Sequence, residues 1–215
     1  YSVRTVSGRD SAGLMMAENL RQEFASYFSA DGSKLVARDP AADWEFSISI
    51  KGYARANQRL PVVAGDWSAD KTNVLASHTV GSSNSKTAFQ IDEVLENRPD
   101  GLEQTFVVHT RPEIAAETSD LPQKQIRIVL ATKGDLDPKV SDDGQAIVLM
   151  KKGAAVLRYD KLKSWDSEGK GLASRMEVDG DEISLVVKDE GAIYPITIDP
   201  TFTQVRKIVA SDGVA

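Results

Sequence analysis

Residues 44–51 read Trp44-Glu45-Phe46-Ser47-Ile48-Ser49-Ile50-Lys51, with a large apolar side chain at every second position. Successive side chains of a β-strand point to opposite faces of its sheet, so this segment has one apolar and one polar face. The same alternation recurs at residues 126–130, 183–187 and 194–198. We therefore expect these segments to be strands of antiparallel sheets that bury one face each.

Turns that contain glycine separate the alternating segments. An aspartate precedes a glycine at residues 31–32, 100–101, 143–144, 179–180 and 212–213. Glycine adopts the positive φ that tight hairpins need, and a preceding aspartate tolerates such turns. This pattern predicts an all-β fold, either an antiparallel β-sandwich or an extended β-meander, with at most one or two short helices. We expect one short helix at residues 10–22, with Leu14, Met15 and Leu20 facing inward.

On this interpretation the chain divides into three parts. Residues 1–22 form an N-terminal segment, which either contains the short helix or acts as an arm that pairs with another sheet. Residues 23–200 form the β-sandwich, either as one unit or as two sub-sheets divided near residues 110–124. Residues 201–215 form a C-terminal strand or a linker. Because the chain starts at Tyr1 and not at a methionine, we expect it to be either processed or excised from a longer protein.

Composition excludes several classes of protein. The formal net charge of -6 and the absence of a basic cluster argue against nucleic acid as a partner, because phosphate binding requires a basic surface. No apolar run approaches the roughly 18 residues needed to span a bilayer as a helix. The sequence contains no cysteine, which excludes disulfides, zinc–thiolate sites and a cysteine nucleophile.

Catalytic motifs are absent from the sequence. Its two histidines, His78 and His109, are expected at the surface, and no Gly-x-Ser-x-Gly turn supplies a nucleophile next to either. The 32 acidic residues cluster mainly at turns, so no pair stands out as a glycosidase acid and base. A phosphate-binding glycine-rich loop is also missing. We therefore expect no catalytic residue and no bound cofactor, and predict that the chain is not an enzyme.

A few residues are nevertheless candidates for binding. Asp179, Asp181 and Glu182 surround one predicted hairpin and could gather around a structural calcium ion, although turn geometry alone accounts for acids there. Trp67 and Trp165 lie near predicted loops, where an exposed indole could stack on a sugar ring or, equally, cover the core. Carbohydrate therefore stays open as a ligand.

The order of several short motifs resembles that of a known group of bacterial proteins. These motifs occupy residues 27–32, 100–106, 143–147, 157–159, 165–169, 194–200 and 209–213. The series resembles the N-terminal β-rich region of bacterial surface proteins that continue into FG-GAP (integrin-α-like) repeats. More distantly it is similar to the head region of proteins with SBBP-type repeats. The resemblance covers residues 18–213, and residues 101–106 and 194–200 are its most specific parts. It implies an exported or cell-surface protein in which this domain precedes a repeat array, and it brings no catalytic motif.

The sequence thus favours a non-enzymatic structural or adhesive module that works by protein–protein contact outside the bacterial cell. A first alternative is a self-assembling subunit of an extracellular fibre, in which residues 1–9 or 202–215 pair with an exposed sheet edge of a neighbour. A second alternative is a carbohydrate-binding module that uses Trp67 or Trp165.

Overall fold

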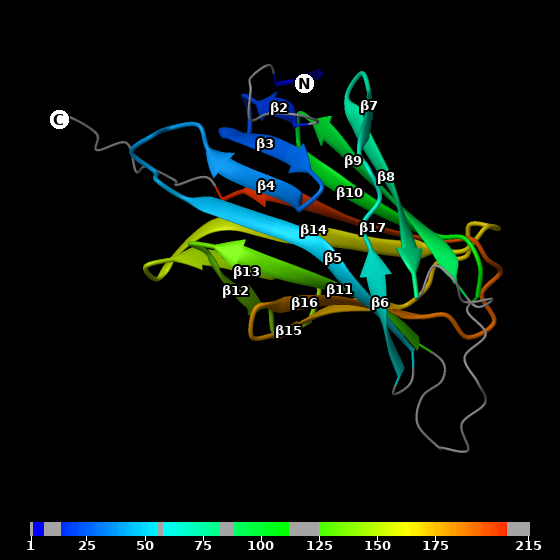
Figure 1. Ribbon diagram of the computed structural model, residues 1–215. Helices are drawn as coiled ribbons and strands as arrows, with labels where there is room; N and C mark the ends of the chain where they lie inside the picture. The colour runs from blue at the N-terminus through cyan, green and yellow to red at the C-terminus, as the bar shows by residue number, and fades with distance from the viewer. Residues whose placement is uncertain (1, 7–13, 56–57, 82–87, 112–124, 206–215) are drawn as a thin grey trace.

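A computed structural model describes residues 2–6, 14–55, 58–81, 88–111 and 125–205 (Figure 1). Within these ranges the chain forms seventeen β-strands and no helix. Each strand pairing is antiparallel, which confirms the predicted all-β antiparallel fold. None of these residues belongs to a helix long and apolar enough to cross a membrane.

The strands form two sheets. Sheet A runs in the order β1 (Val3–Thr5), β2 (Met15–Asn19), β3 (Phe24–Ser29), β4 (Gly32–Ala37), β5 (Glu45–Arg55), β11 (Gln125–Gly134), β16 (Glu182–Lys188) and β15 (Ser174–Asp179). Sheet B runs in the order β7 (Ser68–Asp70), β8 (Asn73–Val80), β9 (Phe89–Arg98), β10 (Gly101–Val108), β17 (Ile196–Gln204), β14 (Ala154–Trp165), β13 (Ile147–Lys151) and β12 (Asp137–Val140).

The remaining strand, β6 (Gln58–Val63), belongs to both sheets. Its first four residues pair with β5 of sheet A, where Gln58 lies opposite Arg55. Its last two residues pair with the end of β8 in sheet B, where Val62 lies opposite Val80. One continuous strand therefore joins the two layers along this side of the molecule.

The two sheets pack face to face as a β-sandwich (Figure 1). Aromatic contacts cross the interface: Phe46 of β5 lies 6.1 Å from Phe202 of β17 between ring centroids, and Tyr53 of β5 lies 5.0 Å from Phe89 of β9. The alternating segments predicted from the sequence supply this core. Residues 44–50, 126–130 and 183–187 bury their apolar members, which are Trp44, Phe46, Ile48, Ile50, Ile126, Ile128, Leu130, Ile183, Leu185 and Val187.

An irregularity in β5 changes which face its side chains occupy. The pairing with β11 shifts between Val129 and Leu130, so that Lys51 is an extra residue in β5. Such a β-bulge moves the following side chains by one position relative to the sheet. As a result Lys51 is exposed, whereas Tyr53 is fully buried and continues the inward series that ended at Ile50.

The predicted helix at residues 10–22 is wrong for the part that the structure describes. Met15–Asn19 form strand β2, which pairs with β3 and buries Met15, Ala17 and Asn19 on its inner face. The amide Nδ2 of Asn19 donates to the side-chain oxygen of Asn97 at 2.8 Å and to the carbonyl of Arg98 at 2.7 Å in sheet B. These bonds tie the β2–β3 turn to the β9–β10 turn.

The sandwich extends beyond the expected limits of residues 23–200. Val3–Thr5 and Met15–Asn19 are strands of sheet A, and residues 201–204 continue β17. Both sheets combine strands from before and after residues 110–124, as the pairing of β5 with β11 and of β10 with β17 illustrates. That region therefore does not separate two sub-sheets; residues 112–124 themselves, like 206–215, lie outside the described ranges.

Candidate functional site

Four polar side chains meet inside the sandwich on the inner face of sheet B. His78 of β8, Glu93 of β9, Gln104 of β10 and Tyr159 of β14 are each at most 2% exposed. Nε2 of His78 lies 2.9 Å from Oε2 of Glu93, and Nε2 of Gln104 donates to Oε1 of Glu93 at 2.5 Å. The hydroxyl of Tyr159 donates to Oε1 of Gln104. We call these four residues the buried polar network.

Strand register brings the network together. Glu93 lies opposite Ala76 in the pairing of β8 with β9, so that His78, two residues further along β8, is its diagonal neighbour. Gln104 lies opposite Leu95 in the next pairing and is a second diagonal neighbour of Glu93. Diagonal pairs are within reach of long side chains on the same face of a sheet. Alternation along β8, β9 and β10 thus places all three side chains inward.

The hydrogen bonds fix the direction in which each group donates. The backbone N–H of Gly65 donates to Nδ1 of His78 at 3.3 Å. With Nδ1 acting as an acceptor, the imidazole is neutral and carries its hydrogen on Nε2, from which it donates to Glu93. Glu93 therefore accepts hydrogen bonds from two uncharged donors, His78 and Gln104. Buried polar groups are costly unless they are hydrogen-bonded, and this network satisfies its members mutually.

Burial also determines the protonation of the tyrosine. Desolvation raises the pKa of the Tyr159 hydroxyl well above its ordinary value, and the nearby carboxyl groups of Glu93 and Asp199 raise it further. The neutral hydroxyl is the form that can donate to Gln104. A phenol held in this state is a poor nucleophile and remains a hydrogen-bond donor.

The prediction that both histidines lie at the surface is wrong for His78. Its side chain is 2% exposed, because Val74, Ala76, His78 and Val80 alternate inward along β8. In the sequence this alternation is concealed because the exposed face carries the apolar Leu75 and the buried face carries the polar His78. His109 does lie at the surface, where its side chain is 44% exposed and its Nε2 is 2.7 Å from Oδ2 of Asp92.

A second pair of acidic residues lies on the outer face of sheet B. Glu103 of β10 and Asp199 of β17 are close enough that burial, followed by the charge of Asp199, raises the pKa of Glu103. Arg98 opposes this effect through an ion pair with Glu103 at 2.7 Å. The hydroxyl of Thr105 donates to Asp199 at 3.0 Å. No sequence pattern distinguishes this pair from the other acidic residues of the chain.

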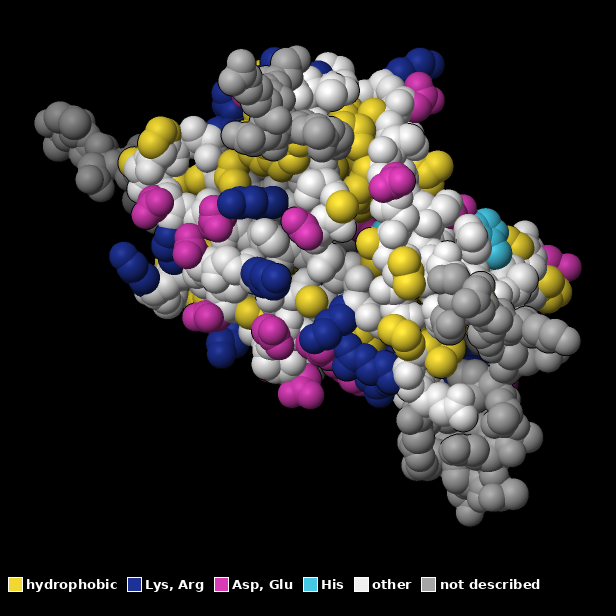
Figure 2. Space-filling model, in the orientation of Figure 1, with side chains coloured by type: hydrophobic (Ala, Val, Ile, Leu, Met, Phe, Trp, Pro, Cys, Tyr) yellow, Lys and Arg dark blue, Asp and Glu magenta, His cyan; other side chains and the backbone are white. Residues whose placement is uncertain are grey.

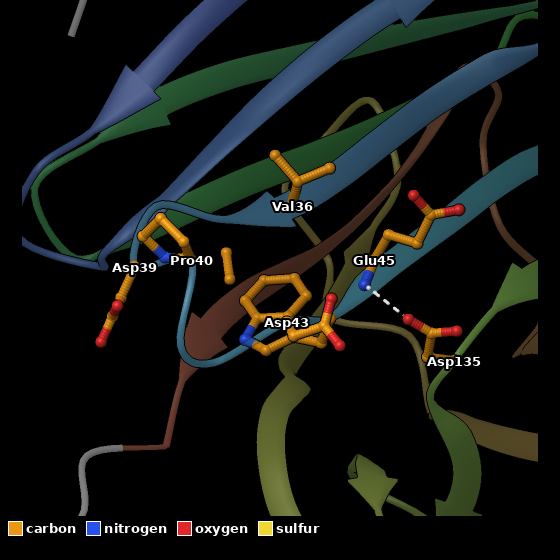
Figure 3. Close-up of a pocket in the computed structure, with 8 residues that line it drawn as sticks. Val36, Asp39, Pro40, Asp43, Glu45 and Asp135 are labelled. Carbon is orange, nitrogen blue, oxygen red and sulfur yellow. Dashed lines mark hydrogen bonds between the residues drawn. The ribbon is translucent and has the colours of Figure 1, made fainter.

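A shallow acidic hollow of about 290 Å³ lies beside the β4–β5 turn (Figure 3). Figure 3 shows Glu45, whose backbone N–H donates to Oδ2 of Asp135 at 3.3 Å, and Asp39 and Asp43 on the turn. The complete lining is Val36, Ala37, Asp39, Pro40, Asp43, Trp44, Glu45 and Asp135. Lys151 lies 3.5 Å from Asp135 and partly balances the acidic charge. This composition is suited to a basic group.

A further ion pair, between Arg55 and Asp189, is buried next to the end of β16. The carboxylate of Asp189 is fully buried, Nη1 of Arg55 lies 2.5 Å from its Oδ2, and the Tyr194 hydroxyl donates to the same oxygen at 2.9 Å. Arg111 donates to the backbone carbonyl of Asp189 at 2.7 Å and lies over the Tyr194 ring at 5.6 Å. Breaking a buried pair leaves an uncompensated charge, so these contacts hold the segment after β16 in place.

The three candidate calcium ligands do not come together. Asp179 and Glu182 are opposite each other in the β15–β16 hairpin, and the carboxylate of Glu182 is bound by Arg59 at 2.9 Å and by Lys51 at 2.9 Å. Hydrogen bonds from these two cations lower the pKa of Glu182 to about 2. Asp181 is exposed and its backbone carbonyl accepts from Thr132. Within the described ranges, no three acidic or histidine side chains are placed to hold a metal ion.

The two candidate tryptophans occupy different environments. Trp67 lies in the β6–β7 connection, half-buried, with its ring 6.0 Å from Phe28 and 6.1 Å from His78. It covers the edge of the core next to the buried polar network. Trp165 ends β14, is also half-buried, and lies opposite Thr197 of β17.

Neither a protein-family model nor a curated protein sequence matches this chain.

Proposed function

We propose that the chain is a non-catalytic structural or adhesive module that acts through protein–protein contact. The observation that carries this proposal is the buried polar network. His78 and Glu93 are the residue types that acid–base catalysis uses, yet they are bonded to each other and to Gln104 within a closed interior. Their hydrogen bonds help to specify a single packing of the two sheets. Buried polar networks have this role when every member is hydrogen-bonded.

The outer surface of sheet A supports the same proposal. On the face turned to the viewer in Figure 2, basic and acidic side chains are interspersed. Several are paired, including Lys34 with Glu45 at 2.6 Å and Arg59 with Glu182 at 2.9 Å. A mixed charged surface of this kind favours solubility and selective protein contact over a reaction at a single centre.

The cell-surface location is part of the proposal and depends on the resemblance to FG-GAP surface proteins. In that setting the module would precede a repeat array. It would either separate the array from another protein or attach the array to that protein. The hydrogen bond between Asn19 of sheet A and Asn97 of sheet B suits a module that must keep its shape while it contacts another protein.

Strand exchange into a fibre is the second candidate, and the sheet edges bear on it. The edge strand β12 contains Pro138, which lacks the N–H that an added strand would bond. An edge strand of sheet A, β15, is partly covered, because the backbone N–H of Met176 donates to the carbonyl of Gly144 at 2.7 Å. Residues 3–5 pair with β2 of their own chain. Exchange of residues 3–5 into a neighbouring subunit would therefore require their pairing with β2 to open.

Hydrolysis assays on the purified chain test the proposal against an enzymatic role. Polysaccharide, peptide and ester substrates are incubated with the wild type and with Glu103→Gln and Glu93→Gln variants. The proposal predicts no turnover that depends on either carboxylate. Turnover that is lost in Glu103→Gln, with circular dichroism unchanged, would overturn it. Sedimentation velocity between about 1 and 100 µM, the range in which weak interfaces associate, separates a discrete module from a self-assembling subunit.

A further inference from the structure

The connection between β6 and β7 is attached to sheet B through His78. β6 pairs with the end of β8, and β7 pairs with its beginning, so that residues 64–67 pass along the middle of β8. There the backbone N–H of Gly65 donates to Nδ1 of His78 at 3.3 Å. Trp67 approaches the same imidazole edge-on, with 6.1 Å between ring centroids.

The connection lies in close contact with β8 at Gly65. A Cβ atom added at Gly65 would lie 2.0 Å from the backbone oxygen of Ser77, so that no other residue fits this position without movement of the backbone. The hydrogen bond to His78 is therefore formed where two backbones are already in contact. If Nδ1 of His78 came to repel the N–H of Gly65, the β6–β7 connection would have to be displaced.

The imidazole ring cannot turn away to relieve such a change. Its Nε2 is bound to Glu93 inside the core, and rotation of the ring would leave this buried carboxyl group without one of its donors. A proton on Nδ1 converts that nitrogen from an acceptor to a donor, which then faces the N–H of Gly65. Two donors that point at each other repel, and the exposed connection is the partner that can move.

Acidic and neutral polar groups surround the imidazole ring. Glu93 of β9 contacts it directly, and Asp66 is exposed in the connection itself. Behind Glu93 stand the neutral Gln104 of β10 and the neutral phenol of Tyr159 of β14. The remaining neighbours are the Trp67 ring with Phe28 of β3 beneath it, and Asp92 on the opposite face of β9, where it binds Ser77 and His109.

We infer that His78 is a proton-operated latch for the β6–β7 connection. With a neutral imidazole the latch holds Gly65, and Trp67 covers Phe28 and the edge of the core. When Nδ1 takes up a proton, Gly65 is released and residues 64–67 leave the side of β8. Histidine is the side chain whose charge changes between about pH 5 and pH 8, so the latch responds to mild acid.

Hydrogen–deuterium exchange of the full chain tests this inference. Exchange is measured at about pH 7.5 and about pH 5.5, with intrinsic rates corrected for pH, the interval being centred on histidine titration. Peptides that cover residues 60–70 are expected to exchange about fivefold faster at the lower pH, which is the factor that loss of one net hydrogen bond gives. Peptides from β16 should not change. Equal protection of residues 60–70 at both pH values would overturn the inference.

The chain supplies its own matched control, because it contains only two histidines. His78→Gln removes the titratable group and should abolish the pH response, whereas His109→Gln should retain it. A response that persists in His78→Gln, or that disappears in His109→Gln, contradicts the latch.

A measurement on the wild type keeps the inference testable if His78→Gln does not fold. Nuclear magnetic resonance of the His78 ring should show hydrogen on Nε2 at neutral pH. The Gly65 amide signal should then shift with the same midpoint as the ring. Titration of the ring with an unchanged Gly65 amide would overturn the inference.

Discussion

Polar groups are stabilised in opposite ways inside the sandwich and on the outer face of sheet A. Inside, Glu93 is bound by the uncharged donors His78 and Gln104. Outside, Glu182 and Glu177 are bound by cations, Arg59 and Arg127 respectively. Exposed ion pairs contribute about 0–1 kcal/mol each, whereas a buried donor left without its partner costs about 1–3 kcal/mol. The comparison indicates that the few buried polar residues matter more for stability than the many surface charges.

The largest effect is expected for Glu93→Ala. The substitution leaves a small cavity and deprives both His78 and Gln104 of their acceptor inside the core. We expect the free energy of unfolding to fall by about 3–5 kcal/mol, as for other core truncations that also leave polar groups unpaired. Urea unfolding followed by tryptophan fluorescence measures the change. A loss below about 1 kcal/mol, the range of surface pairs, would erase the distinction between the two regions.

A smaller effect is expected for Tyr159→Phe, which removes one hydroxyl from the same network. Oε1 of Gln104 then loses its donor, while the stacking of ring 159 on Phe202, with 4.0 Å between centroids, is retained. The free energy of unfolding should fall by about 1–2 kcal/mol. The same unfolding measurement applies, and a thermal melt checks that the transition remains single. Phe202→Leu is the matched variant that disturbs packing without removing a hydrogen bond.

Glu103→Gln tests the outer face of sheet B, where a carboxyl group is less well stabilised. The folded-state pKa of Glu103 is raised by burial and then by Asp199, so its stabilising contribution is present at low pH and is lost as pH rises through that pKa. Wild-type stability should therefore lose this contribution between about pH 4, near the ordinary pKa of a glutamate, and about pH 7. The variant should lack this loss. Urea unfolding curves at the two pH values measure this difference. A larger loss of stability in Glu103→Gln than in the wild type would contradict the raised pKa of Glu103.

The smallest effect at neutral pH is expected for Glu182→Gln. Hydrogen bonds from Arg59 and then Lys51 lower the folded-state pKa of this carboxyl to about 2, so its contribution is present above the unfolded pKa and is lost as pH falls toward about 2. Because the pair is at the surface, we expect a loss below about 1 kcal/mol at pH 7. The acid limb of a stability–pH curve should be flatter in the variant. An unchanged acid limb would show that these ion pairs do not contribute.

Local patterns predicted much of the fold. The alternation at residues 44–50 and 183–187 identified buried strand faces, and the Asp–Gly pairs at 31–32, 100–101 and 179–180 mark hairpin turns in the structure. These features are local, because side-chain direction and turn geometry depend on neighbouring residues.

Features that depend on distant partners were not predicted. Residues 14–20 are compatible with a helix by spacing, but Met15–Asn19 form a strand that pairs with β1 and β3, and Asn19 contacts Asn97 of the other sheet. The pairing of β5 with β11 joins segments some seventy residues apart and leaves no local signal.

The candidate site was missed for a related reason. Glu93 follows Phe89 and Ile91 in the inward series of β9, so the position of the acid could have been read from the alternation. The sequence does not reveal that His78 and Gln104 complete its hydrogen bonds, because this depends on the register between three strands.

The strand β6 has a consequence for how the molecule comes apart. A sandwich whose layers are linked only by loops can lose one layer before the other, but here a single extended segment is hydrogen-bonded into both. Loss of pairing at either end of β6 removes hydrogen bonds from one sheet and loosens the strand that the other sheet pairs with. Loss of β6 removes pairing from both sheets at once, so we expect the two layers to unfold together.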